Sequence, residues 1–269
     1  MKFSASSLFG KMVLIVVGGW TQLGGLTPLR AQTGIIPPQN AKITITVEGV
    51  PVDQTVRRGA HTLAFHRYGG NSAPITTPGI STQSSGSTIL ACVGRGDLSA
   101  FSLPRDNKGN TPYLQLGTAH PYTLWSTSGT ALYSFAKAKG GAGHTVTTDT
   151  PPADEVTLAV VELMNGGLVQ DYKWNEVLSG QPITSLSVTT TGPATLVAFW
   201  WGDAGVDGNK TAIPNNGFAV IDSVLESGAL VQCAVATKEV TAAGTYNVTW
   251  ISTPQQGAQL WLAAVQHAP

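Results

Sequence analysis

The amino-acid sequence predicts an all-β protein, an antiparallel β-sandwich of jelly-roll-like architecture. Three observations lead to this class. The 269 residues include 31 Gly and 16 Pro but only 11% charged residues, a composition typical of short strands joined by tight turns. Apolar residues occur in short runs or alternate with Thr, and no window keeps the period of a helix. Hydrophobic residues make up 42% of the chain, enough to bury a core, which excludes a disordered chain.

Residues 1–31 have the pattern of a secretory signal peptide. Lys2 and Lys11 precede an apolar run at 12–17, and the bond after Ala31 is the best cleavage site. The run is shorter than the ~20 residues that span a bilayer, so we expect no membrane span after signal cleavage. An uncleaved anchor is the alternative. The protein is therefore expected to be secreted, periplasmic or at the cell surface.

The net charge argues against nucleic acid as a partner. The chain carries 15 basic and 15 acidic residues, and residues 1–31 contain Lys2, Lys11 and Arg30 but no acid. The mature chain therefore has a charge of 12 − 15 = −3. It lacks the basic stripe that nucleic-acid-binding proteins show.

The elements can be assigned in chain order from alternation and turn residues. Residues 32–60 are expected to form an N-terminal strand or arm, because residues 42–47 alternate, and a further strand is expected at 61–68. Later strands divide into apolar runs, typical of burial on both faces, and alternating segments. The apolar runs lie at 89–93 and 196–201, the alternating segments at 144–148 and 245–250, and turns at 106–110, 140–143, 214–217 and 241–244. Residues 175–179 allow one helical turn.

The chain repeats its pattern of strands and turns once. The matched segments are 74–76 with 182–184, 88–93 with 195–200, 96–97 with 202–203, 128–136 with 227–234, and 158–162 with 262–266. Because these landmarks recur in one order, we expect two sequence-similar halves, 61–164 and 165–269. One domain at 61–269 hides the apolar faces of both halves, and two small domains are the alternative.

The same matching places both cysteines at core positions. Cys92 takes the position of Phe199 in the other half, and Cys233 takes the position of Phe135. If a pseudo-two-fold axis relates the halves and the cysteines touch, Phe199 must touch Phe135. An oxidising compartment permits a disulfide between Cys92 and Cys233, and two buried free thiols are the alternative.

The strand pattern resembles a family of secreted bacterial and phage-associated β-sandwich domains. The resemblance covers residues 61–267 and depends on the Leu-Tyr-Ser-Phe-Ala-Lys strand at 132–137, an alternating Thr-Val-Thr strand, and the closing strand at 158–163. It implies a sandwich fold and an extracellular role, without an assigned chemistry. The second half has Gln266 where the first has Glu162, which argues against a carboxylate mechanism shared by both halves.

The sequence offers few candidates for catalysis or metal binding. No Gly-x-Ser-x-Gly motif is present, and the five histidines are scattered without ligand spacing. We therefore expect no catalytic residue, no metal site and no cofactor. Glycoside cleavage requires two nearby carboxylates, for which Asp97 with Asp203, or Asp171 with Glu176, are the available pairs. Turn-forming or solvated acids are the simpler interpretation of these residues.

Aromatic residues are the stronger functional signal. Flat amphipathic rings outside strands suit sugar binding, and Tyr122 and Trp125 lie in an expected loop. Tyr172 and Trp174 lie in the expected connection between the halves. Trp200 and Trp201 are adjacent on a strand, so one is expected to point outward. The candidate ligand-binding residues are Tyr122, Trp125, Tyr172, Trp174, Trp201, Asp97 and Asp203.

These observations predict a secreted, non-enzymatic β-sandwich module that binds carbohydrate or a surface polymer. One alternative is a structural protein that self-associates on a cell surface or particle. Another is a polysaccharide-active hydrolase or lyase that uses Asp97, Asp203 or Glu162.

Overall fold

The computed structural model describes residues 7–8, 11–12, 55–69, 73–96, 101–180, 182–202, 211–225, 232–253 and 255–267. Residues 1–50 and 51–269 are separate compact units. In the first unit, β1 (Ser7–Leu8) pairs antiparallel with β2 (Lys11–Met12). The strand expected at 42–47 lies outside the described residues. Asp97 and Asp203, the second residues of the Gly-Asp turns expected in the two halves, also lie outside them. The described part of the chain contains no helix, so none that could span a membrane.

The second unit begins with a half made of one large and one small antiparallel sheet. The first large sheet has the order β3-β11-β5-β9-β7, with β8 also pairing with β9, and the first small sheet has the order β4-β10-β6. The strands of this first half are β3 (Arg57–His66), β4 (Ile75–Thr76), β5 (Ser85–Arg95), β6 (Arg105–Asp106), β7 (Leu114–Gln115), β8 (His120–Pro121), β9 (Gly129–Lys139), β10 (Val146–Thr148) and β11 (Val156–Met164).

The second half has the same arrangement. Its large sheet has the order β12-β21-β15-β18-β17, its small sheet has the order β13-β20-β16, and β14 pairs with β19. The strands are β12 (Leu168–Val177), β13 (Ile183–Thr184), β14 (Val188–Thr190), β15 (Ala194–Gly202), β16 (Thr211–Pro214), β17 (Ala219–Val224), β18 (Cys233–Val240), β19 (Gly244–Tyr246), β20 (Thr249–Thr253) and β21 (Ala258–Gln266).

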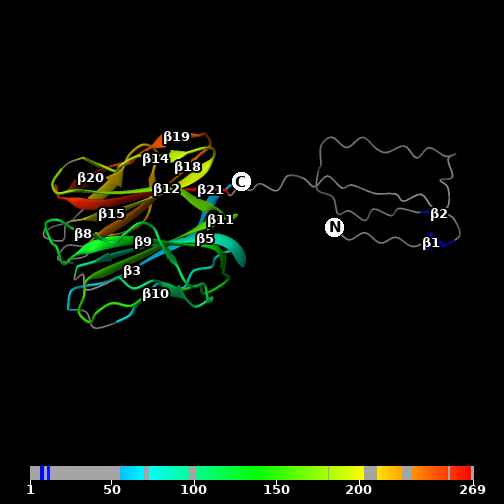
Figure 1. The fold of residues 1–269 in the computed structure, drawn as a ribbon, viewed down its shortest axis with the longest axis horizontal. Helices are drawn as coiled ribbons and strands as arrows, with labels where there is room; N and C mark the ends of the chain where they lie inside the picture. The colour runs from blue at the N-terminus through cyan, green and yellow to red at the C-terminus, as the bar shows by residue number, and fades with distance from the viewer. Residues whose placement is uncertain are drawn as a thin grey trace. The chain divides into compact units, whose positions relative to one another are not determined.

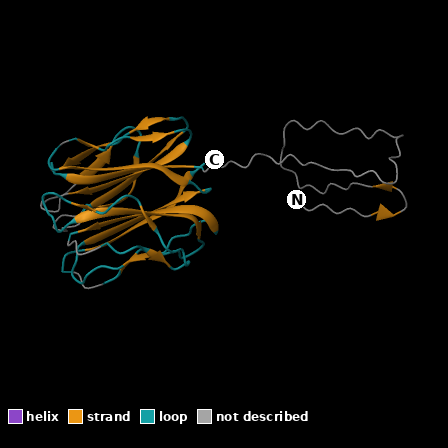
Figure 2. Cartoon of the chain, viewed as in Figure 1, coloured by secondary structure: helices purple, strands orange, loops and turns teal. Residues whose placement is uncertain are grey.

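The two large sheets pack face to face and form a central core, while each small sheet covers the outer face of its large sheet (Figure 1). Leu90 and Leu132 meet Val197 and Phe199 in the central core. The large sheets are therefore buried on both faces. This explains why β5, β15 and β21 are nearly continuous apolar runs, as expected for residues 89–93 and 196–201. Figure 2 shows that the described chain consists of strands and loops throughout. The all-β sandwich prediction is confirmed.

Two reciprocal hydrogen bonds connect the halves. The Thr88 hydroxyl donates to the carbonyl of Gly167, immediately before β12, at 2.6 Å. The Thr195 hydroxyl donates to the carbonyl of Val56, immediately before β3, at 2.7 Å. Each half therefore donates a hydrogen bond to the residue just before the first strand of the other half, as a pseudo-two-fold arrangement requires. A duplication of the sequence remains a prediction.

Several expected details differ in the structure. The strand expected at 61–68 is Arg57–His66, and residues 175–177 belong to β12 rather than to a helical turn. Both cysteines are buried in the central core, as expected, and they are free thiols, which was one of the two alternatives. The match of Cys233 with Phe135 was wrong. Trp201 pairs with Cys233 while Gly94 pairs with Thr130, so Cys233 corresponds to Thr130 and not to Phe135.

The expected contact between Phe199 and Phe135 is therefore not made. Phe199 lies in the central core, whereas Phe135 packs against the first outer core on the other face of its sheet. The matching failed because short strands of small and apolar residues fit one another at several registers, and a shift by an odd number of residues exchanges the two faces.

Candidate functional site

The most accessible aromatic ring among the predicted binding residues lies on a tight turn between β8 and β9. The backbone amide of Tyr122 donates to the carbonyl of Ser128 at 2.8 Å, and the Ser128 amide donates to the Trp125 carbonyl at 2.8 Å. The Trp125 amide donates to the Tyr122 carbonyl at 3.1 Å. We call residues 122–128 the Trp125 turn. Leu124 and Trp125 are 49% and 52% exposed, so a hydrogen-bonded backbone presents both side chains to solvent.

The Trp125 turn belongs to the first half but is fastened to the second. The Thr123 amide donates to Glu176 Oε2 on β12 at 3.0 Å, and the Thr123 hydroxyl donates to Glu176 Oε1. The Tyr122 hydroxyl lies beside Gly257, where an added Cβ would approach it to 2.3 Å. The glycine therefore leaves room for the buried base of the turn.

A ring stack and a chain of hydrogen bonds support the start of the Trp125 turn. The His120 ring stacks on Trp174 with centroids 3.8 Å apart and an angle of 6° between the planes. The His120 carbonyl accepts a hydrogen bond from Gln259 Nε2 at 3.1 Å, and Thr130 links Gln259 to Trp261. Burial lowers the pKa of His120, and the nearby Glu176 charge opposes this shift. A neutral imidazole stacked between the halves is the result.

The structure separates the predicted aromatic residues into three groups. Trp125 is exposed, as expected for a binding residue. Tyr122 and Trp201 are buried and cannot contact a ligand from solvent. Tyr172 and Trp174 lie on β12 rather than in a loop and pack against the central core. Neither Trp200 nor Trp201 points outward, because the sheet that carries them is covered on both faces.

The predicted carboxylates do not form a catalytic pair among the described residues. Asp97 and Asp203 lie outside the described ranges. Asp171 and Glu176 are five residues apart on β12, which separates them by roughly 16 Å, more than the 6.5–9.5 Å of an inverting pair. Asp171 also forms an ion pair with Lys173 at 2.6 Å and accepts a hydrogen bond from the Thr189 amide.

Glu162 is a buried structural acceptor. Its carboxylate accepts hydrogen bonds from the amides of Ala60 and Gln83 at 3.0 and 2.7 Å, and from the Ser87 hydroxyl at 2.5 Å. Gln266 accepts a hydrogen bond from the Thr191 amide in a comparable way. The strand pairings also correct the match between these two residues. Glu162 pairs with Ile89 and Ala264 pairs with Leu196, so Glu162 corresponds to Ala264 rather than to Gln266.

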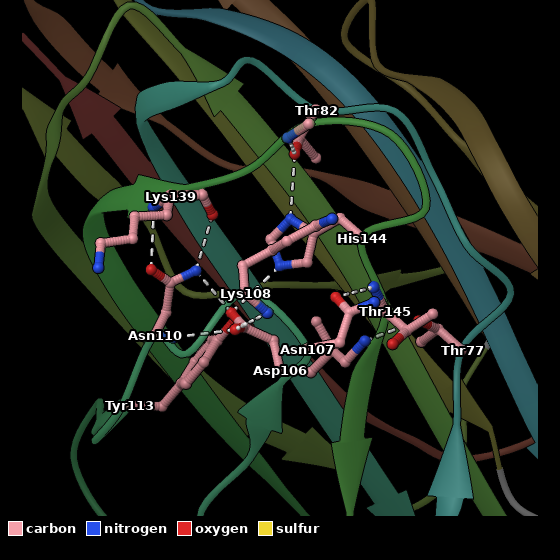
Figure 3. A network of polar contacts seen from close by, with 12 residues as sticks. Thr77, Thr82, Asp106, Asn107, Lys108, Asn110, Tyr113, Lys139, His144 and Thr145 are labelled. Atoms are coloured by element: carbon pink, nitrogen blue, oxygen red, sulfur yellow. Dashed lines mark hydrogen bonds and ion pairs between the residues drawn. The ribbon is translucent and has the colours of Figure 1, made fainter.

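Sequence reasoning missed a second site, a buried network centred on Asp106 (Figure 3). Asp106 Oδ1 accepts from the amides of Lys108 and Asn110 at 3.0 and 2.9 Å. Asp106 Oδ2 accepts from the Asn110 side chain at 2.7 Å and the Tyr113 hydroxyl at 2.9 Å, and it contacts His144 Nε2 at 3.1 Å. The residues come from separate segments, and the only sequence signal was the turn pattern at 106–110 and 140–143.

The network places a hydroxyl, an imidazole and a carboxylate in series, because His144 Nδ1 contacts the Thr82 hydroxyl oxygen at 3.0 Å. This order occurs in nucleophilic enzymes. Here the Thr82 oxygen also accepts the Gly141 amide at 3.1 Å, and the side chains of His144 and Asp106 are 1% and 0% exposed. His144 Nε2 faces Asp106 and Nδ1 faces the Thr82 hydroxyl, so both ring nitrogens have a hydrogen-bond partner. The arrangement acts as a clamp between loops.

The hydrogen bonds of the network favour the ionised form of Asp106. Burial raises the pKa of this carboxyl, but hydrogen bonds from His144, Asn110 and Tyr113 outweigh the effect and lower it to about 2. Hydrogen bonds from these donors occupy both carboxylate oxygens, so Asp106 has little remaining capacity to bind a cation. Within the described ranges, no group of three or more His, Cys, Asp or Glu side chains is placed to hold a metal ion.

Glu155 is a further titratable residue that sequence reasoning missed. Burial, and then the neighbouring Asp154 charge, raise its pKa to about 7, a value suited to a general acid. Asp154 forms a buried ion pair with Arg95 at 2.8 Å, so it is not free to act as the second carboxylate of a glycosidase.

No family model, curated protein or solved structure matches this chain. The resemblance to secreted β-sandwich domains therefore remains a prediction from the sequence.

Proposed function

We propose that this protein is a secreted, non-enzymatic module that binds a polysaccharide or a similar surface polymer through the Trp125 turn. The observation that carries the proposal is the 52% exposed Trp125 ring on a turn closed by backbone hydrogen bonds. Aromatic rings offer a flat apolar face to the C–H groups of a sugar ring.

Preorganisation makes the exposed ring a suitable binding element. A ligand that stacks on Trp125 does not need to order the backbone, so less of the binding free energy is lost to entropy. The hydroxyl groups of Ser126 and Thr127 follow Trp125 in the sequence and supply hydrogen-bond partners for sugar hydroxyls. Exposure of the ring, closure of the turn and neighbouring polar groups together favour binding over packing.

The test is binding of residues 32–269 to immobilised neutral and acidic polysaccharides. We expect Trp125→Ala to weaken binding by about tenfold or more, as expected for loss of a stacked ring. Tyr68 is 70% exposed in another loop and serves as the matched aromatic control, so Tyr68→Ala should stay within about twofold of wild type. Absence of binding to every polysaccharide would rule out the function. Release of reducing ends from a bound polymer would instead favour a hydrolase and direct attention to Glu155.

An assembly role is the second candidate, and one surface feature favours it. An apolar groove of about 380 Å³ lies between β7, β9 and the start of β12, and exposed Leu114 and Leu168 line it. Self-association through this groove predicts that light scattering mass rises with concentration and that Leu114→Asp prevents the rise. A strict monomer at high concentration would contradict this role.

A further inference from the structure

Glu176 connects the two halves at the Trp125 turn. The residue lies near the end of β12 in the second half. Its carboxylate accepts hydrogen bonds from both the amide and the hydroxyl of Thr123 in the first half. Thr123 lies between the buried Tyr122 and the exposed Leu124 and Trp125. The contact therefore fixes the backbone at the point where the turn leaves the core.

Loss of this acceptor would loosen the exposed side of the turn. The backbone hydrogen bonds of the turn join Tyr122, Trp125 and Ser128, but none of them uses the Thr123 amide. Without Glu176, that amide would bond to water, and the residues between Tyr122 and Trp125 would gain conformational freedom. A ligand would then have to order them on binding.

Glu176 also places a negative charge at the Trp125 turn. Its carboxylate is within hydrogen-bond distance of Thr123, two residues from Trp125. A carboxylated or sulfated sugar stacked on Trp125 would place a like charge nearby, whereas a neutral sugar would gain a hydrogen-bond acceptor for its hydroxyl groups.

We propose that Glu176 is a positioning residue of the Trp125 turn and that its charge restricts the ligand to neutral polysaccharides. This inference rests on the proposed binding function. It means that a complete site requires both halves of the molecule, since the ring comes from one half and the residue that orders it comes from the other.

Two substitutions separate positioning from charge. Glu176→Gln removes the charge. It keeps a side-chain oxygen that accepts from the Thr123 amide, and its N–H group can donate to the Thr123 hydroxyl oxygen. Glu176→Ala removes both contacts. Glu239, an exposed residue on β18, provides the control Glu239→Ala. Each variant of residues 32–269 is tested against neutral glucan, xylan and chitin, and against acidic alginate, pectin and chondroitin sulfate.

We expect wild type to prefer neutral polymers, and Glu176→Ala to bind them about fivefold more weakly. Glu176→Gln should stay within about twofold on neutral polymers and gain about fivefold on acidic ones. Glu239→Ala should behave as wild type. Preference of the wild type for acidic polymers, or equal binding by wild type and Glu176→Ala, would overturn the inference while leaving the proposed function intact.

Amide hydrogen exchange measures the positioning without any ligand. Protection of the Thr123 amide should be lost in Glu176→Ala and kept in Glu176→Gln, while core amides remain unchanged. Unaltered protection in Glu176→Ala would overturn the positioning role. If wild type binds no polysaccharide, the proposed function and the charge restriction both fail, and the exchange result still decides whether Glu176 orders the turn.

Discussion

Asp106 is the residue at which one side-chain change should be most costly. Its buried carboxylate accepts hydrogen bonds from Asn110 and Tyr113, in the segment that follows it, and contacts His144, 38 residues away in the sequence. An Asn side chain cannot accept at both positions, so Asp106→Asn leaves buried donors without partners. We expect the free energy of unfolding to fall by about 3 kcal/mol, measured by urea denaturation.

The neighbouring pair Arg105 and Asp149 provides the control. These side chains form a bidentate ion pair at 2.8 Å, but both are about half exposed. Because solvent screens exposed pairs, Asp149→Asn should change the free energy of unfolding by less than about 1 kcal/mol. Equal effects of the two substitutions would contradict the assignment of the Asp106 network as a clamp.

The contribution of Asp106 should also depend on pH. The folded state lowers the pKa of this carboxyl from 3.8 to about 2, so ionised Asp106 contributes fully above its ordinary value. The contribution is then lost as the pH falls toward 2, because the carboxyl takes up a proton at a higher pH in the unfolded state than in the folded state. The difference in stability between wild type and Asp106→Asn should therefore be constant above pH 4 and shrink below it.

At the level of elements, the two large sheets pack closely because a glycine faces a tryptophan. Gly94 on β5 lies against Trp201 on β15, and an added Cβ would approach Trp201 Nε1 to 2.2 Å. A Cβ at this distance forces the ring or a strand to move. Thr157 Oγ1, at 2.8 Å from the same added atom, blocks another direction.

We therefore expect Gly94→Ala to reduce the free energy of unfolding by about 1–3 kcal/mol, as overpacked cores do. Gly192→Ala is the matched control, since the nearest atom to its added Cβ is the flexible Gln266 side chain at 3.6 Å. Thermal unfolding of the two variants measures the difference. Similar melting temperatures for both would show that the sheets adjust without cost.

At the level of the whole molecule, the central core belongs to both halves. Leu90, Leu132 and Val161 face Val197, Val235 and Ala263 across the interface, and all are buried. Residues 51–164 alone would expose their side of this core to water. We expect this fragment, and residues 165–269, to aggregate or to lack a cooperative unfolding transition when expressed separately.

Size-exclusion chromatography and circular dichroism check this expectation. Co-expression of the two fragments should restore a soluble complex, because the buried surfaces and the bonds from Thr88 and Thr195 complement each other. A monomeric fragment that unfolds cooperatively would show instead that each half is an independent domain.

Local sequence determined the all-β class of this protein and one part of its candidate site, but it did not predict that Tyr172 and Trp174 lie on β12. Alternation, apolar runs and Gly- or Asn-rich turns depend on backbone propensity, which neighbouring residues decide, so the all-β class followed from them. Trp125 was expected in a loop, and it lies on the turn between β8 and β9.

Only the tertiary structure decided which faces are covered and which distant residues meet. Tyr122 and Trp201 are buried because a second sheet and a glycine-lined base lie against them. The clamp joins Thr82, Asp106 and His144, and Glu176 reaches Thr123 across the two halves. Such contacts depend on strand register and sheet packing, in which a shift of one residue exchanges the two faces of a strand, and local propensity does not specify that register.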